Sequence, residues 1–136
     1  MLQKPIGYWV KLADNALTLR MNEMFSAHGI TRIDWQILNI IGGESIASES
    51  YLLGTMRIHT DDETLHGAIG KLTGMGWASR AGNGYSLTEE GRKQFDAIGS
   101  TNRSFREMVA EGISPEDYQT AISVLQRIIA NLETAG

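Results

Sequence analysis

The side chains most able to bind a metal, an anion or nucleic acid lie between residues 57 and 83. His59, Asp62 and His66 are spaced to approach one helix face, and imidazole and carboxylate groups are zinc ligands. His59, however, precedes the expected helix, and a third strong ligand is missing. We therefore expect no metal site, and interpret His66 as an exposed polar residue whose partial protonation helps phosphate contact.

Residue patterns typical of catalysis do not occur in the sequence. It has no G-x-S-x-G turn, no phosphate-binding glycine loop and no H-E-x-x-H helix. The absence of cysteine excludes a thiol nucleophile, a thiolate zinc site and a disulfide framework. The pairs Glu89-Glu90 and Glu116-Asp117 lie at expected helix starts, where acids complement the helix dipole. We expect neither an enzyme nor a cofactor.

The composition is that of an ordinary globular domain. The 136 residues suit one domain, with 42% hydrophobic and 21% charged residues. No apolar run approaches the roughly 18 residues that cross a membrane. The first residues do not resemble a secretory signal. These features predict a soluble, cytoplasmic protein without a membrane partner.

The charge distribution argues against nucleic-acid binding when it is taken alone. The net charge is −4, and residues 1–43, 44–87 and 88–136 carry four, three and five basic against three, five and eight acidic groups. Nucleic-acid-binding proteins usually have a basic surface. An acidic dimerisation region can nevertheless conceal a small basic face.

Apolar periodicity predicts a mainly helical chain. The expected helices span about residues 6–28, 31–42, 49–57, 60–74, 88–111 and 114–134. Thr31 and Asp34 form a capping pattern, and Thr60 with Glu63 predicts a second capping box. Residues 44–48 are expected to form a polar loop.

A short hairpin is predicted between the fourth and fifth helices. Residues 77–80 and 84–87 have the character of strands, and the connecting Ala81-Gly82-Asn83-Gly84 contains the hairpin dipeptide Asn-Gly. Three short helices, a hairpin and further helix are the layout of a winged helix-turn-helix.

With long apolar helices at both ends, the chain from Tyr8 to Leu132 resembles the MarR family of winged-helix transcriptional regulators. The stretches that carry the resemblance are GITRIDWQIL (29–38), IGKLTGMGW (69–77), YSLTEEGR (85–92) and ISPED (113–117). The resemblance implies one mainly helical domain over residues 1–136. Its dimerisation helices would span about 5–28 and 100–134, and its winged helix about 31–92.

The family resemblance also implies a homodimer that binds double-stranded operator DNA to regulate transcription. The helix that begins near residue 60 would enter the major groove, and each hairpin would approach the minor groove or backbone. The expected DNA-binding residues are Thr64, His66, Gly67, Lys71, Arg80 and Asn83. The expected dimer-interface residues are Ile6, Tyr8, Ile122, Leu125, Ile129 and Leu132.

Many members of the family bind a small aromatic or anionic effector between the dimerisation helices and the DNA-binding lobe. By this resemblance Trp9, Ala13 and Trp35 are expected to line such a cleft. The alternative is that Trp9 and Trp35 are aromatic residues of the core or of the dimer interface.

Two features depart from the family pattern. The hairpin is short and its tip is uncharged, and Asp61, Asp62 and Glu63 place three acids at the start of the recognition helix. Neighbouring phosphates would repel these acids. The alternative function is therefore a MarR-like module with weakened or lost DNA binding that works through protein–protein interaction.

Overall fold

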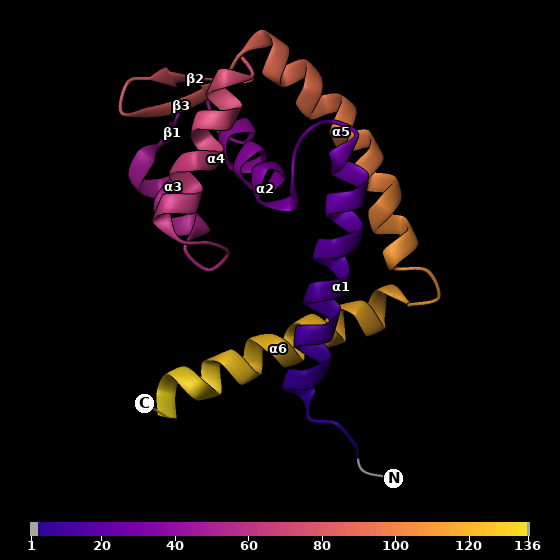
Figure 1. Ribbon diagram of the computed structural model, residues 1–136. Helices are drawn as coiled ribbons and strands as arrows, with labels where there is room; N and C mark the ends of the chain where they lie inside the picture. The colour runs from indigo at the N-terminus through magenta and orange to yellow at the C-terminus, as the bar shows by residue number, and fades with distance from the viewer. Residues whose placement is uncertain (1–2, 136) are drawn as a thin grey trace. The chain divides into compact units, whose positions relative to one another are not determined.

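The computed structural model describes residues 3–135, which form helices and three short strands (Figure 1). In chain order the elements are α1 (Ile6–Ser26), α2 (Arg32–Gly42), β1 (Ala47–Ser48), α3 (Glu49–Met56), α4 (Asp62–Gly74), β2 (Ala78–Ala81), β3 (Gly84–Leu87), α5 (Glu89–Val109) and α6 (Pro115–Ala135). The chain divides into two compact units, one ending at Ile98 and the other beginning at Gly99. The boundary lies within α5.

The first unit is a winged helix built around α2, α3 and α4. These helices contribute their apolar faces to one core, as the periodicity predicts. The largest fully buried side chains of this unit are Phe25, Ile37, Leu38, Ile41, Leu52, Met56, Leu65, Leu72 and Ile98. The outer face of α4 remains exposed, and it is bordered by the small sheet (Figure 1).

The start of α2 confirms the predicted capping box. The Thr31 hydroxyl accepts a hydrogen bond from the Asp34 backbone N–H at 3.3 Å. The Thr31 backbone N–H in turn donates to Asp34 Oδ2 at 2.9 Å.

The predicted cap of α4 at Thr60 is wrong by one residue. The Thr60 backbone N–H still donates to the Met56 carbonyl at 3.1 Å, so the chain completes the turn after α3 before α4 begins. Asp61 takes the cap position and accepts from the Thr64 backbone N–H at 2.6 Å. Because the helix then begins at Asp62, Glu63 is one position too early to close a capping box.

The prediction of a polar loop over residues 44–48 is also wrong in part, because Ala47 and Ser48 form β1. The three strands are antiparallel in the order β1-β3-β2, with Ala47 opposite Tyr85 and Ser48 opposite Gly84. A Cβ atom at Gly84 would lie 1.9 Å from the Ala47 carbonyl oxygen, so this close pairing requires glycine.

The hairpin is tighter than expected. Ala81 and Gly84 face each other in the ladder, and the four-residue tip is therefore a two-residue turn of Gly82 and Asn83. Gly82 has a φ of +55°, a conformation that favours glycine. We call the hairpin formed by residues 78–87 the wing.

The second unit consists of the end of α5 and the whole of α6. Ser114 caps α6 by accepting from the Asp117 backbone N–H at 3.0 Å, as the sequence predicts. No residue of α6 from Pro115 to Ala135 is buried. In the described part of the chain, no helix combines the length and apolar character required to cross a membrane.

Candidate nucleic-acid interface

Five of the six predicted DNA-binding residues are on two adjacent exposed surfaces. Thr64, His66 and Gly67 are exposed on α4, whereas Leu65, Ile69 and Leu72 of the same helix are buried. The helical period therefore separates a core face from an outer face.

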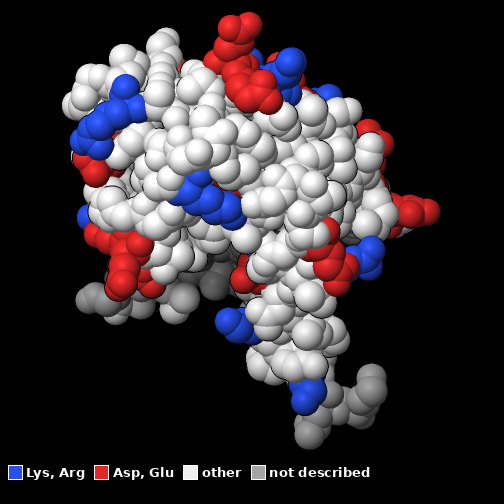
Figure 2. Space-filling view, turned by 45° about the horizontal axis from the view of Figure 1, so that its top comes forward, with Lys and Arg blue, Asp and Glu red and all other residues white. Residues whose placement is uncertain are grey.

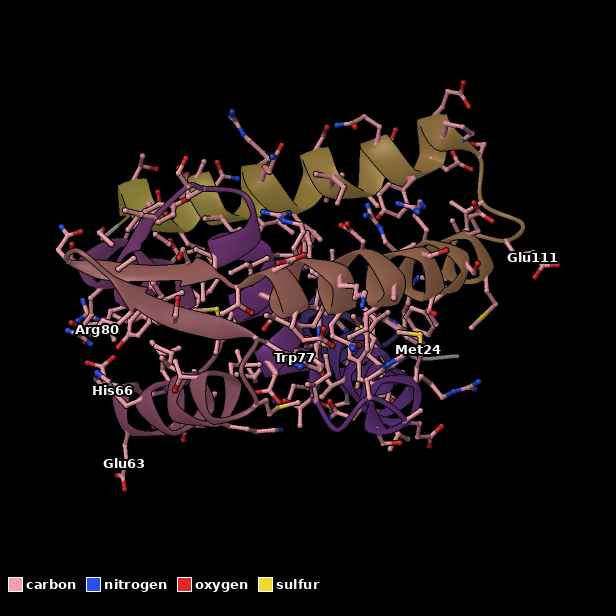
Figure 3. The ribbon with its side chains drawn as sticks, turned by 90° about the horizontal axis from the view of Figure 1, so that it is seen from above. Met24, Glu63, His66, Trp77, Arg80 and Glu111 are labelled. Carbon is pink, nitrogen blue, oxygen red and sulfur yellow. The ribbon has the colours of Figure 1, made fainter. Side chains whose placement is uncertain are left out.

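Arg80 and Asn83 are exposed on the wing, and Figure 3 shows the Arg80 and His66 side chains near each other. Glu63 points away from both in the same view. We call Thr64, His66, Gly67, Arg80 and Asn83 the recognition face.

Lys71, the sixth predicted residue, has a different environment. Its ammonium donates to Asp34 Oδ2 at 2.6 Å, and the Asp34 side chain is only 3% exposed. The same carboxylate oxygen accepts from the Thr31 backbone N–H. Lys71 thus connects α4 to the first turn of α2, a contact between residues 37 positions apart that sequence patterns did not indicate.

Glu49, the first residue of α3, contacts both basic side chains of the recognition face. Its carboxylate oxygens lie 3.4 Å from His66 Nε2 and 3.6 Å from an Arg80 guanidinium nitrogen. The Arg80 guanidinium also donates to the Tyr85 hydroxyl at 2.7 Å. No sequence pattern marked Glu49 as functional, since an acid in the first turn of a helix is ordinary.

Two further cations are paired in the same way. Arg57 lies 3.6 Å from Asp62, and Arg32 lies 2.9 Å from Asp14 while donating to the Thr18 hydroxyl at 2.7 Å. Figure 2 shows acidic and basic side chains interspersed on the face in view, with no broad basic patch on it. The surface of this fold is therefore electrostatically mixed where the sequence predicts DNA contact.

The Asp61 carboxyl at the start of α4 has a pKa below its ordinary value. The hydrogen bonds that its carboxylate accepts from Thr64 lower its pKa below 3.8. The carboxylate consequently stays ionised at the start of α4, where it stabilises the helix as its cap.

Comparison with solved structures identifies the fold that carries the recognition face. No protein-family model matches the sequence, and no curated protein matches it. Solved structures of MarR-type regulators do match: one from Acinetobacter sp. ADP1 aligns with a TM-score of 0.80 and 14% identity over 95% of each chain. The reduced form of MarR from E. coli aligns at 0.77 and 17%, covering 93% of this chain and 95% of that one. A MarR-family regulator from Rhodococcus sp. RHA1 aligns at 0.80 and 19%, covering 90% and 92%.

The chain has the MarR fold. This result confirms the predicted fold class, a mainly helical winged helix-turn-helix with a short hairpin wing. At identities this low, the similarity concerns the fold.

Within the MarR fold, the residues expected to line an effector cleft have unlike environments. Trp35 is 5% exposed and stacks on Phe95 with ring centroids 5.2 Å apart, and it lies 5.6 Å from the Phe25 ring. Trp35 is therefore a core aromatic, the alternative interpretation of this residue. Trp9 and Ala13 are exposed on α1, Trp9 with 54% of its surface accessible.

A cavity of about 610 Å³ occurs elsewhere in the first unit. It is lined by side chains of α1, by the first turns of α2 and by the turn between α3 and α4, among them Asp14, Arg32 and Gln36. Neither the family resemblance nor the apolar patterns of the sequence indicated this cavity, most of whose lining residues are of polar types.

The residues predicted for the dimer interface carry large exposed apolar surfaces. Ile6 and Tyr8 on α1 are 49% and 43% exposed, and Ile129 and Leu132 on α6 are 54% and 69% exposed. Ile122 is also exposed, and Leu125 is half-buried.

His59, Asp62 and His66 are not gathered into a metal site. The His66 ring faces the Asp62 carbonyl and Glu49, and the Asp62 carboxylate faces Arg57. Among residues 3–135, no group of three or more potential metal-ligating side chains is found.

Proposed function

We propose that this protein is a cytoplasmic DNA-binding transcriptional regulator that acts as a homodimer. The observation that carries the proposal is the recognition face, an exposed side of α4 with a wing beside it, in a fold shared with proteins described as transcriptional regulators. In a helix-turn-helix, the second helix enters the major groove with its first turns toward the bases. Thr64, His66 and Gly67 would then face base edges, and Arg80 and Asn83 would face the backbone or minor groove.

Lys71 has a positioning role in this proposal. Its ammonium is bound to Asp34, so its main effect is to hold α4 against α2. Because 40% of the Lys71 side chain is exposed, a phosphate can also approach it without breaking the core.

The homodimer is supported by the exposed apolar residues of α1 and α6. Large side chains that a soluble monomer would leave in water are typical of an interface. Ile6, Tyr8, Ile122, Leu125, Ile129 and Leu132 would be covered by a second copy of the chain. Two recognition helices related by a two-fold axis would then read two half-sites of an operator.

We also propose that a small effector molecule modulates the regulator. An aromatic or anionic molecule bound between α1 and the winged helix would change the spacing of the recognition helices. The exposed Trp9 and Ala13 remain candidates to contact it, while the burial of Trp35 restricts that residue to shaping the core.

The second candidate function is a MarR-like module that works through protein contact. It is favoured by the ion pairs that Arg32, Arg57, His66, Lys71 and Arg80 make with acids of the same chain. Ion pairs of this kind reduce the positive potential available to phosphates.

Fluorescence anisotropy distinguishes the two candidates. The purified protein is titrated against labelled DNA from upstream of its own gene and against random DNA, from low to physiological salt. A regulator binds its own fragment more tightly than random DNA, and log K falls with log salt. His66→Gln with Arg80→Gln should weaken this binding about tenfold or more, whereas Arg103→Gln on α5 should change it little. Flat anisotropy at low salt would exclude the regulator and favour the protein-contact module.

A further inference from the structure

We propose that the Glu49 carboxylate occupies the position of a nucleic-acid phosphate and competes with DNA for His66 and Arg80. This inference rests on the proposed DNA-binding function and adds to it a residue that limits affinity. It makes Glu49 an internal competitor of the ligand.

The contacts of Glu49 are those that a phosphate would make. One carboxylate oxygen faces His66 on α4, and the other faces the Arg80 guanidinium on β2. The recognition helix and the wing are the two elements expected to contact DNA, and Glu49 bridges their cationic side chains. An imidazolium and a guanidinium around two anionic oxygens form a site for any compact oxyanion.

The two ring nitrogens of His66 both face acceptors. Nδ1 lies 2.8 Å from the Asp62 backbone carbonyl, which accepts only, so Nδ1 must carry a hydrogen. Nε2 lies 3.4 Å from the Glu49 carboxylate, which is likewise an acceptor. Nε2 donates to the carboxylate only when the ring is protonated, and a phosphate would attract the same imidazolium. A carboxylate and a phosphate can therefore exchange at this position.

The backbone holds Glu49 in place. Its N–H donates to the carbonyl of Asn83 in the wing turn at 3.0 Å, and the preceding Ser48 both pairs with Gly84 and caps α3. The competing carboxylate is thus tied to the same wing that carries Arg80. Movement of the wing toward DNA would not by itself separate the two.

A phosphate that takes the place of the Glu49 carboxylate must displace it, although the His66 and Arg80 side chains are themselves 52% and 62% exposed. Exposed ion pairs are individually weak, and the Glu49 side chain is 34% exposed. The expected effect is therefore moderate: Glu49→Gln should bind DNA about tenfold more tightly at low salt, with a steeper salt dependence because two more cations per protomer become available. Glutamine keeps the size of the side chain and the helical backbone.

Glu44→Gln is the matched control. It removes the same charge from the loop that leads to β1, and Glu44 has no ion pair among the described residues. An effect of net charge alone would appear equally in both variants.

Heparin chromatography tests the competition without requiring operator binding. Glu49→Gln should elute at clearly higher salt than Glu44→Gln. In a background of His66→Gln and Arg80→Gln, the two variants should elute together, since no cation remains to be released. Equal elution in the wild-type background, or an undiminished Glu49 effect without the two cations, would overturn the proposal. Circular dichroism verifies folding, and if the glutamine variant is unfolded, Glu49→Asp, whose shorter side chain reaches less far, replaces it with Glu44→Asp as the control of equal charge.

The DNA titration separates this inference from the proposed function. If the heparin difference depends on His66 and Arg80 but neither wild type nor Glu49→Gln prefers upstream DNA to random DNA, the competition by Glu49 stands and the regulator fails. If wild type is inactive and Glu49→Gln binds upstream DNA selectively, Glu49 is the residue that suppresses binding in this chain.

Discussion

The winged helix and helix α6 differ in how completely they bury their apolar residues. In the first unit, α2 alone buries Trp35, Ile37, Leu38 and Ile41. In α6, whose apolar residues recur with equally clear helical spacing, no residue is buried. Equal periodicity therefore does not mean an equal environment. A stripe packed within the chain stabilises the protomer, and a stripe left exposed is available to another chain.

Two leucine-to-alanine substitutions test this difference most directly. Leu38→Ala should lower the free energy of unfolding by about 3 kcal/mol, since Leu38 is fully buried and its loss leaves a cavity. Leu132→Ala, at a residue 69% exposed, should leave the unfolding of the winged helix nearly unchanged and instead raise the dissociation constant of the proposed dimer. Urea unfolding and sedimentation at several protein concentrations measure both effects. Equal losses of unfolding free energy at the two positions would contradict the comparison.

The contrast extends to the charged residues of the first unit. Lys71 pairs with the buried Asp34, whereas the acid that pairs with Arg80, Glu49, has a side chain that is 34% exposed. Lys71→Met should lower the free energy of unfolding by about 2 kcal/mol, because it leaves a buried carboxylate without its cation, although Lys71 itself is partly solvated. Lys93→Met, which removes an exposed lysine of α5, is the control and should have little effect. Thermal unfolding of the two variants side by side gives the difference, and a Lys71 effect as small as that of Lys93 would show that the pair contributes nothing to the core.

The smallest effect concerns the cap of α4 and appears only in acid. Because the folded-state pKa of Asp61 is lowered from 3.8, its contribution to stability is present above about pH 3.8 and is lost as the pH falls through the lower folded value. Asp61→Asn keeps a capping side chain without a titrating group. The variant should match wild type at neutral pH and lose less stability on acidification. Parallel acid-unfolding curves below pH 4 would show that Asp61 does not contribute to this dependence.

Much of the fold could be predicted because its signals are local. Thr31 and Asp34 are three residues apart, and their capping box forms as expected. The Asn-Gly hairpin and the order of the six helices were likewise predicted from neighbouring residues. The error at Thr60 was also local: either Thr60 or Asp61 can cap a helix, and the hydrogen bond from Thr60 N–H to Met56 determines which one does.

For the residues predicted to bind DNA, exposure on α4 follows from helical spacing, whereas their ion pairs do not. Helical spacing accounts for the exposure of Thr64, His66 and Gly67, because Leu65, Ile69 and Leu72 of the same helix turn toward the core. It gave no sign that Glu49 would lie between His66 and Arg80, nor that Lys71 would pair with Asp34. Strand β1 was not predicted for a related reason. Two residues are too few to show a period, and they form a strand only because they pair with β3.

Composition, capping residues and apolar periodicity were thus sufficient for the helices and the hairpin, whose order, with the resemblance to the MarR family, indicated the type of fold. Each of these depends on interactions within a few residues of chain, which a linear pattern records. The partners of the charged side chains depend on segments far apart in the chain that meet in the folded protein. Whether an apolar stripe is buried depends in the same way on what packs against it. Only in the folded protein does Lys71 connect α4 to α2, and only there does Glu49 lie beside the two cations that are expected to bind DNA.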